Sequence, residues 1–75
     1  MPKLPVLSGS DVLKILRKMG FEKGRQKGSH VIMKKVLEDK TIGCVVPMHK
    51  EVARGTLHNI LRQAQIEAEE FLENV

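Results

Sequence analysis

Residues 21–46, FEKGRQKGSHVIMKKVLEDKTIGCVV, decide the fold, because short extended segments alternate there with tight polar turns. Runs of apolar and β-branched residues bounded by glycines or charges are typical of β-strands. We predict strands over residues 21–27, 30–37 and 41–46, with residues 38–40 as the turn between the last two. Connections this short join antiparallel neighbours, so the stretch predicts a three-stranded antiparallel meander. Pro47 has no N–H to donate and is expected to end the third strand.

An amphipathic helix is predicted over residues 9–20, before the first strand. Ser10 is placed to cap its N-terminus, and Gly20 is a natural stop at its C-terminus. Between these ends, apolar residues recur at helical spacing, at Val12, Leu13, Ile15, Leu16 and Met19. The segment is therefore expected to bury one face.

A second helix is predicted after the strands, opening at Thr56 as its cap. Its apolar stripe consists of Leu57, Ile60, Leu61 and Ala64. Residues 67–73 are expected to add one or two acidic turns that fold Phe71 and Leu72 back onto the core. The order α-β-β-β-α predicts one α+β domain over residues 1–75, with both helices on one face of the sheet.

Length and composition exclude several classes of protein. The chain has 75 residues, 41% of them hydrophobic and 29% charged, which is the balance of a folded domain and not of a disordered tail. The single Cys cannot form an intramolecular disulfide, and the Cys and His residues lack zinc-site spacing. No segment has the ~20 apolar residues of a membrane span. We therefore expect a cytoplasmic protein with neither metal nor cofactor.

Basic charge is concentrated in the first half of the chain. Residues 1–35 carry nine basic and two acidic residues, a net +7, whereas the remainder carries four basic and seven acidic residues, a net -3. This asymmetry favours an anionic partner such as nucleic acid, although a solvated basic surface is the simpler alternative. With two Phe and no Trp or Tyr, the chain has no aromatic platform for single-stranded bases if both Phe lie in the core.

His30 is the preferred candidate for proton-transfer chemistry, because histidine is the side chain that ordinarily titrates near neutral pH. It follows Gly28 and Ser29 in the stretch KGRQKGSH, residues 23–30. Gly28 permits close approach of a ligand to the backbone. Phosphates are expected to be held beside the imidazole by three residues that alternate onto one strand face, Lys23, Arg25 and Lys27. The alternative is a strand-edge histidine beside a turn glycine.

The remaining reactive side chains are weaker candidates. His49 is a secondary candidate that either contacts RNA or ties its own loop to the backbone, and we favour the structural interpretation. His58 is expected at the edge of a helical stripe or in solvent. Cys44 lies in an apolar strand and is expected to behave as a small buried hydrophobe rather than as a nucleophile.

Two motifs give the chain a resemblance to a known family. The first is RQKGSH at residues 25–30, preceded by Gly20-Phe21. The second is VPMH at residues 46–49, followed by Gly55-Thr56-Leu57, Ile60-Leu61 and Glu69-Glu70-Phe71. In this order and at these spacings they resemble the HicA (YcfA-like) family of toxin–antitoxin ribonucleases. The resemblance implies a double-stranded-RNA-binding-domain-like fold and an mRNA-cleaving toxin held inactive by a HicB-type antitoxin.

Carried over by position, the resemblance makes His30 the catalytic residue, with Gly28 and Ser29 shaping the turn before it. A neutral His30 is then expected to take the proton from an RNA 2′-hydroxyl, which attacks the adjacent phosphorus without a metal ion. The candidates for stabilising the phosphorane charge are Arg25, Lys27 and Lys34. At Gln65 the chain departs from the family, which commonly has a Gly that ends the second helix in a left-handed conformation.

Two competing functions remain open from the sequence: a non-catalytic RNA-binding module of the same fold, and an interaction domain whose basic face meets an acidic protein. Recognition of duplex RNA is a weaker hypothesis, because the expected lysines at the start of the second helix are reduced to Lys50 and Arg54. The strand phase is open as well. Alternation in residues 31–33, which are all apolar, does not decide whether His30 faces outward together with Lys34 or inward toward the helices.

Overall fold

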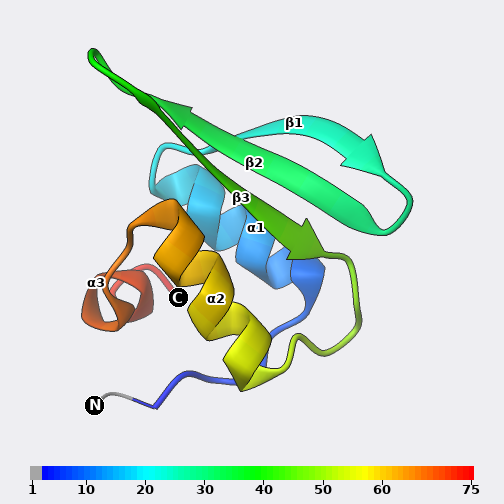
Figure 1. The fold of residues 1–75 in the computed structure, drawn as a ribbon. Coiled ribbons are helices and arrows are strands. Elements are labelled where there is room, and N and C mark those ends of the chain that lie inside the picture. The colour runs from blue at the N-terminus through cyan, green and yellow to red at the C-terminus, as the bar shows by residue number, and fades with distance from the viewer. Residues whose placement is uncertain (1–2) are drawn as a thin grey trace.

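The computed structural model describes residues 3–75 and has the predicted α+β architecture (Figure 1). Its elements are α1 (Gly9–Lys18), β1 (Glu22–Lys27), β2 (His30–Val36), β3 (Thr41–Pro47), α2 (Arg54–Ala64) and α3 (Ala68–Leu72). The strands form an antiparallel sheet in the order β1-β2-β3. Figure 1 shows α1 and α2 covering the same face of this sheet, which confirms the predicted layers.

Burial along β2 establishes the strand phase that the sequence leaves open. Val31 and Met33 are both 0% exposed and face the helices, whereas His30 and Lys34 are exposed. Because side chains alternate along a strand, His30 and Lys34 lie together on the face that the helices leave uncovered. We call this uncovered side the open face of the sheet.

A β-bulge interrupts β1 between Lys23 and Gln26, where one extra residue is accommodated opposite β2. Before the bulge, Lys23 is the Cα partner of Met33; after it, Lys27 is the partner of His30. Since cross-strand partners share a face, Lys23 lies on the helix side and Lys27 on the open face. The prediction that Lys23, Arg25 and Lys27 share one face is therefore wrong, because strict alternation fails at a bulge.

Helix α1 begins two residues earlier than the predicted cap requires. Ser8, not Ser10, is the N-cap: its Oγ accepts a hydrogen bond from the Asp11 N–H at 3.0 Å, and an Asp11 carboxylate oxygen accepts one from the Ser8 N–H at 3.2 Å. This reciprocal pair is a capping box. The pKa of the Asp11 carboxyl is lowered by hydrogen bonding to Ser8, first from its backbone N–H and then from its side chain. At the other end Gly20 has φ +95° and stops the helix as predicted.

Helix α2 also begins before its predicted cap. Ala53 occupies the N-cap position and makes no side-chain hydrogen bond, so Thr56 lies inside the first turn. The start is instead held from outside the helix, since Arg54 Nε donates to the carbonyl of Leu4 at 2.9 Å. The predicted stripe is confirmed, with every member at most 3% exposed: Leu57, Ile60, Leu61 and Ala64.

The core between the layers includes both phenylalanines, Phe21 at 3% and Phe71 at 0% exposed. Neither ring is therefore available as a stacking platform for bases. Cys44 is buried as predicted, at 2% exposed, and burial raises the pKa of its thiol to about 11. Among the residues that the structure describes, no helix has both the length and the apolar character that crossing a membrane requires.

Candidate active site

The turn between β1 and β2 places His30 at one end of the sheet. Lys27 and His30 close the hairpin as Cα partners, which leaves Gly28 and Ser29 as a two-residue loop. Gly28 has φ +59°, as the first central residue of a type II′ hairpin turn requires. Gln26 Nε2 donates a hydrogen bond to the Gly28 carbonyl at 3.1 Å and adds support from β1.

This turn is fastened to the connection between β3 and α2. The Met48 N–H donates to the Ser29 carbonyl at 2.6 Å, and the Gly9 N–H at the start of α1 donates to the His49 carbonyl at 2.9 Å. Gly9 also lies so close to the Pro47 carbonyl oxygen that a Cβ would overlap it. Three segments distant in the sequence therefore meet beside His30, through backbone contacts that hold the turn in place.

The His30 imidazole is exposed and lies on the open face. Within residues 3–75 no side-chain hydrogen bond holds it. Directly opposite on β1, Lys27 shares its face, and Cα atoms of such partners lie ~4.5–5.5 Å apart. The arrangement pairs a group that can exchange a proton with an adjacent cation.

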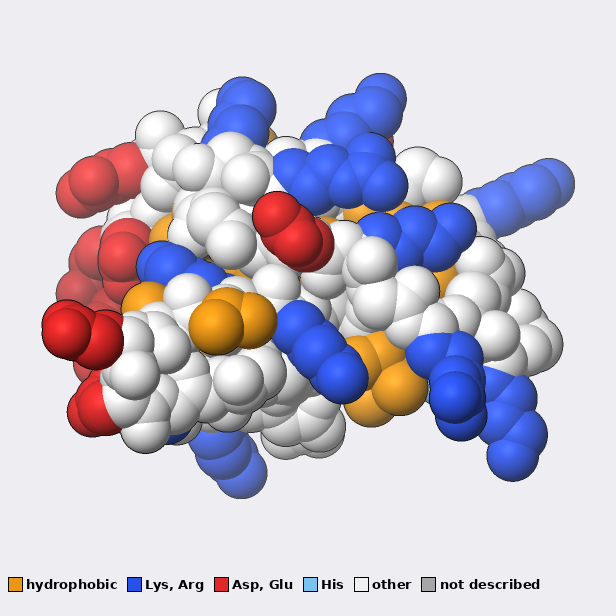
Figure 2. Space-filling view, turned by 90° about the horizontal axis from the view of Figure 1, so that it is seen from above, with side chains coloured by type: hydrophobic (Ala, Val, Ile, Leu, Met, Phe, Trp, Pro, Cys, Tyr) orange, Lys and Arg blue, Asp and Glu red, His pale blue; other side chains and the backbone are white. Residues whose placement is uncertain are grey.

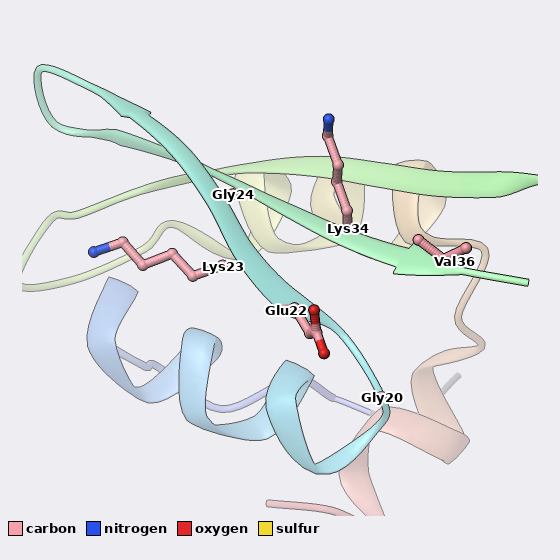
Figure 3. Close-up of a pocket in the computed structure, with 6 residues that line it drawn as sticks. All are labelled: Gly20, Glu22, Lys23, Gly24, Lys34 and Val36. Atoms are coloured by element: carbon pink, nitrogen blue, oxygen red, sulfur yellow. The ribbon is translucent and has the colours of Figure 1, made fainter.

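The other predicted basic residues lie farther from His30 or on the other side. Lys34 is on the open face but four residues along β2, roughly 13 Å away at ~3.3 Å per residue. Arg25 is exposed within the bulge, and Lys23 extends from β1 on the side of α1 (Figure 3). Figure 2 looks down on the sheet from the side opposite the helices, and at its right, where the β1–β2 turn lies in Figure 1, the charged side chains in view are basic.

Comparison with protein families provides an independent result. The model of the family described as "HicA toxin of bacterial toxin-antitoxin" matches residues 9–66, which is most of the chain. The chain belongs to the HicA toxin family. It is accordingly a toxin of a toxin–antitoxin system, and HicA membership implies an antitoxin partner in general. Comparison with individual curated proteins yields no match.

His49, the secondary candidate, does not tie its loop through the side chain. The tie is made by its backbone carbonyl, which accepts from Gly9, while its imidazole is exposed and unbonded within the described residues. The favoured structural interpretation of the imidazole is therefore wrong. His58 is exposed on α2, as expected. No group of three or more His, Cys, Asp or Glu residues able to hold a metal ion occurs in residues 3–75.

Two features of this candidate site were not predicted from the sequence. Gly9 positions the Pro47–His49 segment, yet the contact joins residues about forty positions apart and leaves no local signal. Glu22 is the Cα partner of Lys34, and its place on the open face depends on the bulge. The bulge had one sequence signal, a glycine within a strand pattern at Gly24.

Proposed function

We propose that this HicA-family toxin is an endoribonuclease that cleaves mRNA without a metal ion, uses His30 as its catalytic base, and is inhibited by a HicB-type antitoxin. The observation that carries the proposal is the exposed His30 on the open face, with Lys27 directly opposite it on a backbone-anchored turn. Membership of the HicA toxin family supports the same activity.

In the proposed reaction, the neutral His30 imidazole accepts the proton of an RNA 2′-hydroxyl. The 2′-oxygen forms a bond to the adjacent phosphorus as the bond from phosphorus to the 5′-oxygen breaks, and the leaving oxygen gains a proton. The products are a 2′,3′-cyclic phosphate and a 5′-hydroxyl. A positioned base contributes about 10²- to 10⁴-fold in rate, so the charge that develops on phosphorus needs stabilisation as well.

Lys27 is the best placed of the basic candidates for this stabilisation. It shares the open face with His30 and is its cross-strand partner, whereas Lys34 lies roughly 13 Å along β2. A lysine ammonium beside a phosphoryl oxygen makes a charge-assisted hydrogen bond, about twice as strong as a neutral one. A Cβ at Gly28 would meet nothing within 4 Å, so this position leaves room for the ribose-phosphate backbone to approach.

The test is incubation of end-labelled unstructured RNA with the purified protein in excess EDTA. The wild type is expected to cleave and His30→Ala to lose cleavage while remaining folded. His58→Ala is the matched control, because it removes an exposed imidazole from α2. Cleavage of 2′-O-methylated RNA or of DNA would contradict the mechanism, since neither has the attacking hydroxyl. If the wild type and His30→Ala both bind RNA and neither cleaves it, the chain is the non-catalytic RNA-binding module instead.

Inhibition by a HicB-type protein is tested with the same substrate. An equimolar amount is expected to stop cleavage and to displace RNA, because a protein that covers the β1–β2 turn also covers the basic end of the open face. If the two proteins form a stable complex that still cleaves RNA at the full rate, occlusion of His30 is excluded.

A further inference from the structure

A hollow of about 300 Å³ lies at the far end of β1 and β2 from His30 (Figure 3). Its lining residues are Gly20, Glu22, Lys23, Gly24, Lys34 and Val36, and His30 is not among them. The volume is at the lower limit for sites that hold small organic molecules. The hollow is thus a feature separate from the candidate active site, but on the same hairpin.

Two opposite charges border this hollow without neutralising each other. Glu22 and Lys34 are Cα partners, yet Figure 3 shows the Lys34 ammonium rising from the sheet while the Glu22 carboxylate stays beside β1. Lys23 lines the hollow as well, but its side chain leaves on the side of α1. The hollow therefore offers one cationic donor and one carboxylate acceptor to the same ligand.

The rest of the lining is uncharged, and the stem of Lys34 lies beside Gly24. Gly20 and Gly24 contribute no side chains, and Val36, 78% exposed, supplies an apolar surface beside them. A nucleotide has a group that suits each part of this lining. Its phosphate suits the lysine, an amino group on its base suits the carboxylate, and the apolar face of its base suits the valine. Carboxylates accept hydrogen bonds from the amino group of cytosine in this way.

We propose that the hollow is a nucleotide-binding subsite for single-stranded RNA, in which Lys34 binds a phosphate and Glu22 accepts a hydrogen bond from a base amino group. The proposal rests on the proposed RNA-cleaving function and extends it to recognition of a base remote from the cleaved bond. The roughly 13 Å from His30 to Lys34 corresponds to about four nucleotides at ~3.4 Å each, or fewer in an extended strand. Lys34 therefore acts on binding and not on the reacting phosphate.

The experiment compares the binding of two twelve-nucleotide probes, oligocytidylate and oligouridylate, to the His30→Ala protein, which prevents cleavage during the measurement. Both probes are long enough to reach the hollow from His30 in either direction. Of their two bases, cytosine has an amino group and uracil has none. We expect oligocytidylate to bind about three- to tenfold more tightly. Adding Glu22→Ala is expected to abolish this preference, whereas Glu73→Ala, which removes an exposed carboxylate after α3, leaves it unchanged.

Adding Lys34→Ala is expected to weaken the binding of both probes equally, by about fivefold at 0.1 M salt. It is also expected to reduce the slope of log affinity against log salt concentration by ~0.7, the value for one phosphate contact on a single strand. Lys14→Ala is the matched control, because Lys14 is an exposed lysine on α1. In the His30-containing enzyme, Lys34→Ala is expected to raise KM for unstructured RNA and to leave kcat unchanged.

Three results would overturn the subsite: equal affinity for the two probes, a preference that survives Glu22→Ala, or equal effects of Lys34→Ala and Lys14→Ala. These results are distinguishable from failure of the proposed function. If the wild type cleaves no RNA but Glu22→Ala and Lys34→Ala change probe binding as expected, the catalytic role of His30 fails and the subsite stands. If the protein binds neither probe, the RNA function fails and the subsite with it.

Discussion

Gly9→Ala offers the most direct test of how the candidate active site is held. A Cβ at position 9 would overlap the Pro47 carbonyl oxygen and would lie 2.8 Å from Met48 Cα. Both are backbone atoms, so neither can rotate away as a side chain would. The methyl group can be accommodated only if α1 and the Pro47–His49 segment move apart, which breaks the 2.9 Å hydrogen bond from Gly9 to His49.

The expected loss of stability follows from these contacts. Overpacking by one methyl group costs about 1–3 kcal/mol, and the hydrogen bond adds about 1 kcal/mol. Alanine returns at most about 1 kcal/mol through its higher helix propensity. A net loss of about 1–4 kcal/mol in the free energy of unfolding lowers Tm by roughly 4–32 °C in a domain of this size.

The assay is thermal unfolding followed by circular dichroism, together with RNA cleavage below the transition. Gly55→Ala is the matched control, because a Cβ there meets nothing within 4 Å and α2 gains helix propensity, so its Tm should rise. Gly9→Ala should also cleave more slowly when folded, since the segment that moves is bonded to Ser29 beside His30. An unchanged Tm with full activity would refute the reasoning.

Three further predictions concern local interactions. Gln65→Gly should stabilise the protein by about 0.5–1 kcal/mol, because Gln65 has φ 57° and the lost Lys40 hydrogen bond is exposed; a lower Tm would contradict this. Ser8→Ala should cost about 1 kcal/mol at pH 7 in urea unfolding. Because the folded state lowers the pKa of Asp11, its carboxylate stabilises the fold above the ordinary carboxyl pKa, and this effect is lost as pH falls through the folded value. The wild type and Asp11→Ala should therefore converge in stability in acid, whereas the difference between the wild type and Ser8→Ala, which comes from a hydroxyl, should persist. The pKa of Cys44 is raised to about 11, so its thiol should resist thiol reagents at pH 8.5 until the protein unfolds; rapid labelling of the native protein would contradict this. The contribution of the buried thiol to stability is complete below pH ~9 and should disappear as pH rises toward 11.

The fold was predictable because its signals are local. The apolar stripe of α2, the stop at Gly20 and the short turns each specify an element from neighbouring residues, and short turns leave little choice of topology. The helix starts were less predictable. At α1, two serines compete, and only Ser8 has an acidic residue three positions later. At α2, the start depends on Leu4, fifty residues away, which no local pattern indicates.

For the candidate site, the sequence predicted His30 as a candidate base but did not predict the arrangement around it. Gly28 before His30 is a local turn signal, and it placed the histidine correctly at the hairpin end. Which basic residues accompany His30 depends on strand register, and three consecutive apolar residues in β2 conceal the phase. The Pro47–His49 segment beside the turn is held by backbone hydrogen bonds, so no pattern of side chains in the sequence predicts its position.

The bulge in β1 resolves a conflict between two anchors of that strand. Phe21 is buried just before β1, and the hairpin turn fixes Lys27 opposite His30. In a regular strand, residues an odd number apart point to opposite faces, so Glu22 and Lys27 could not share one. The extra residue reverses the phase and lets Phe21 reach the core while both Glu22 and Lys27 lie on the open face. The same bulge thus sets Lys27 beside His30 and Glu22 beside Lys34, which gives the hairpin its two distinct candidate sites.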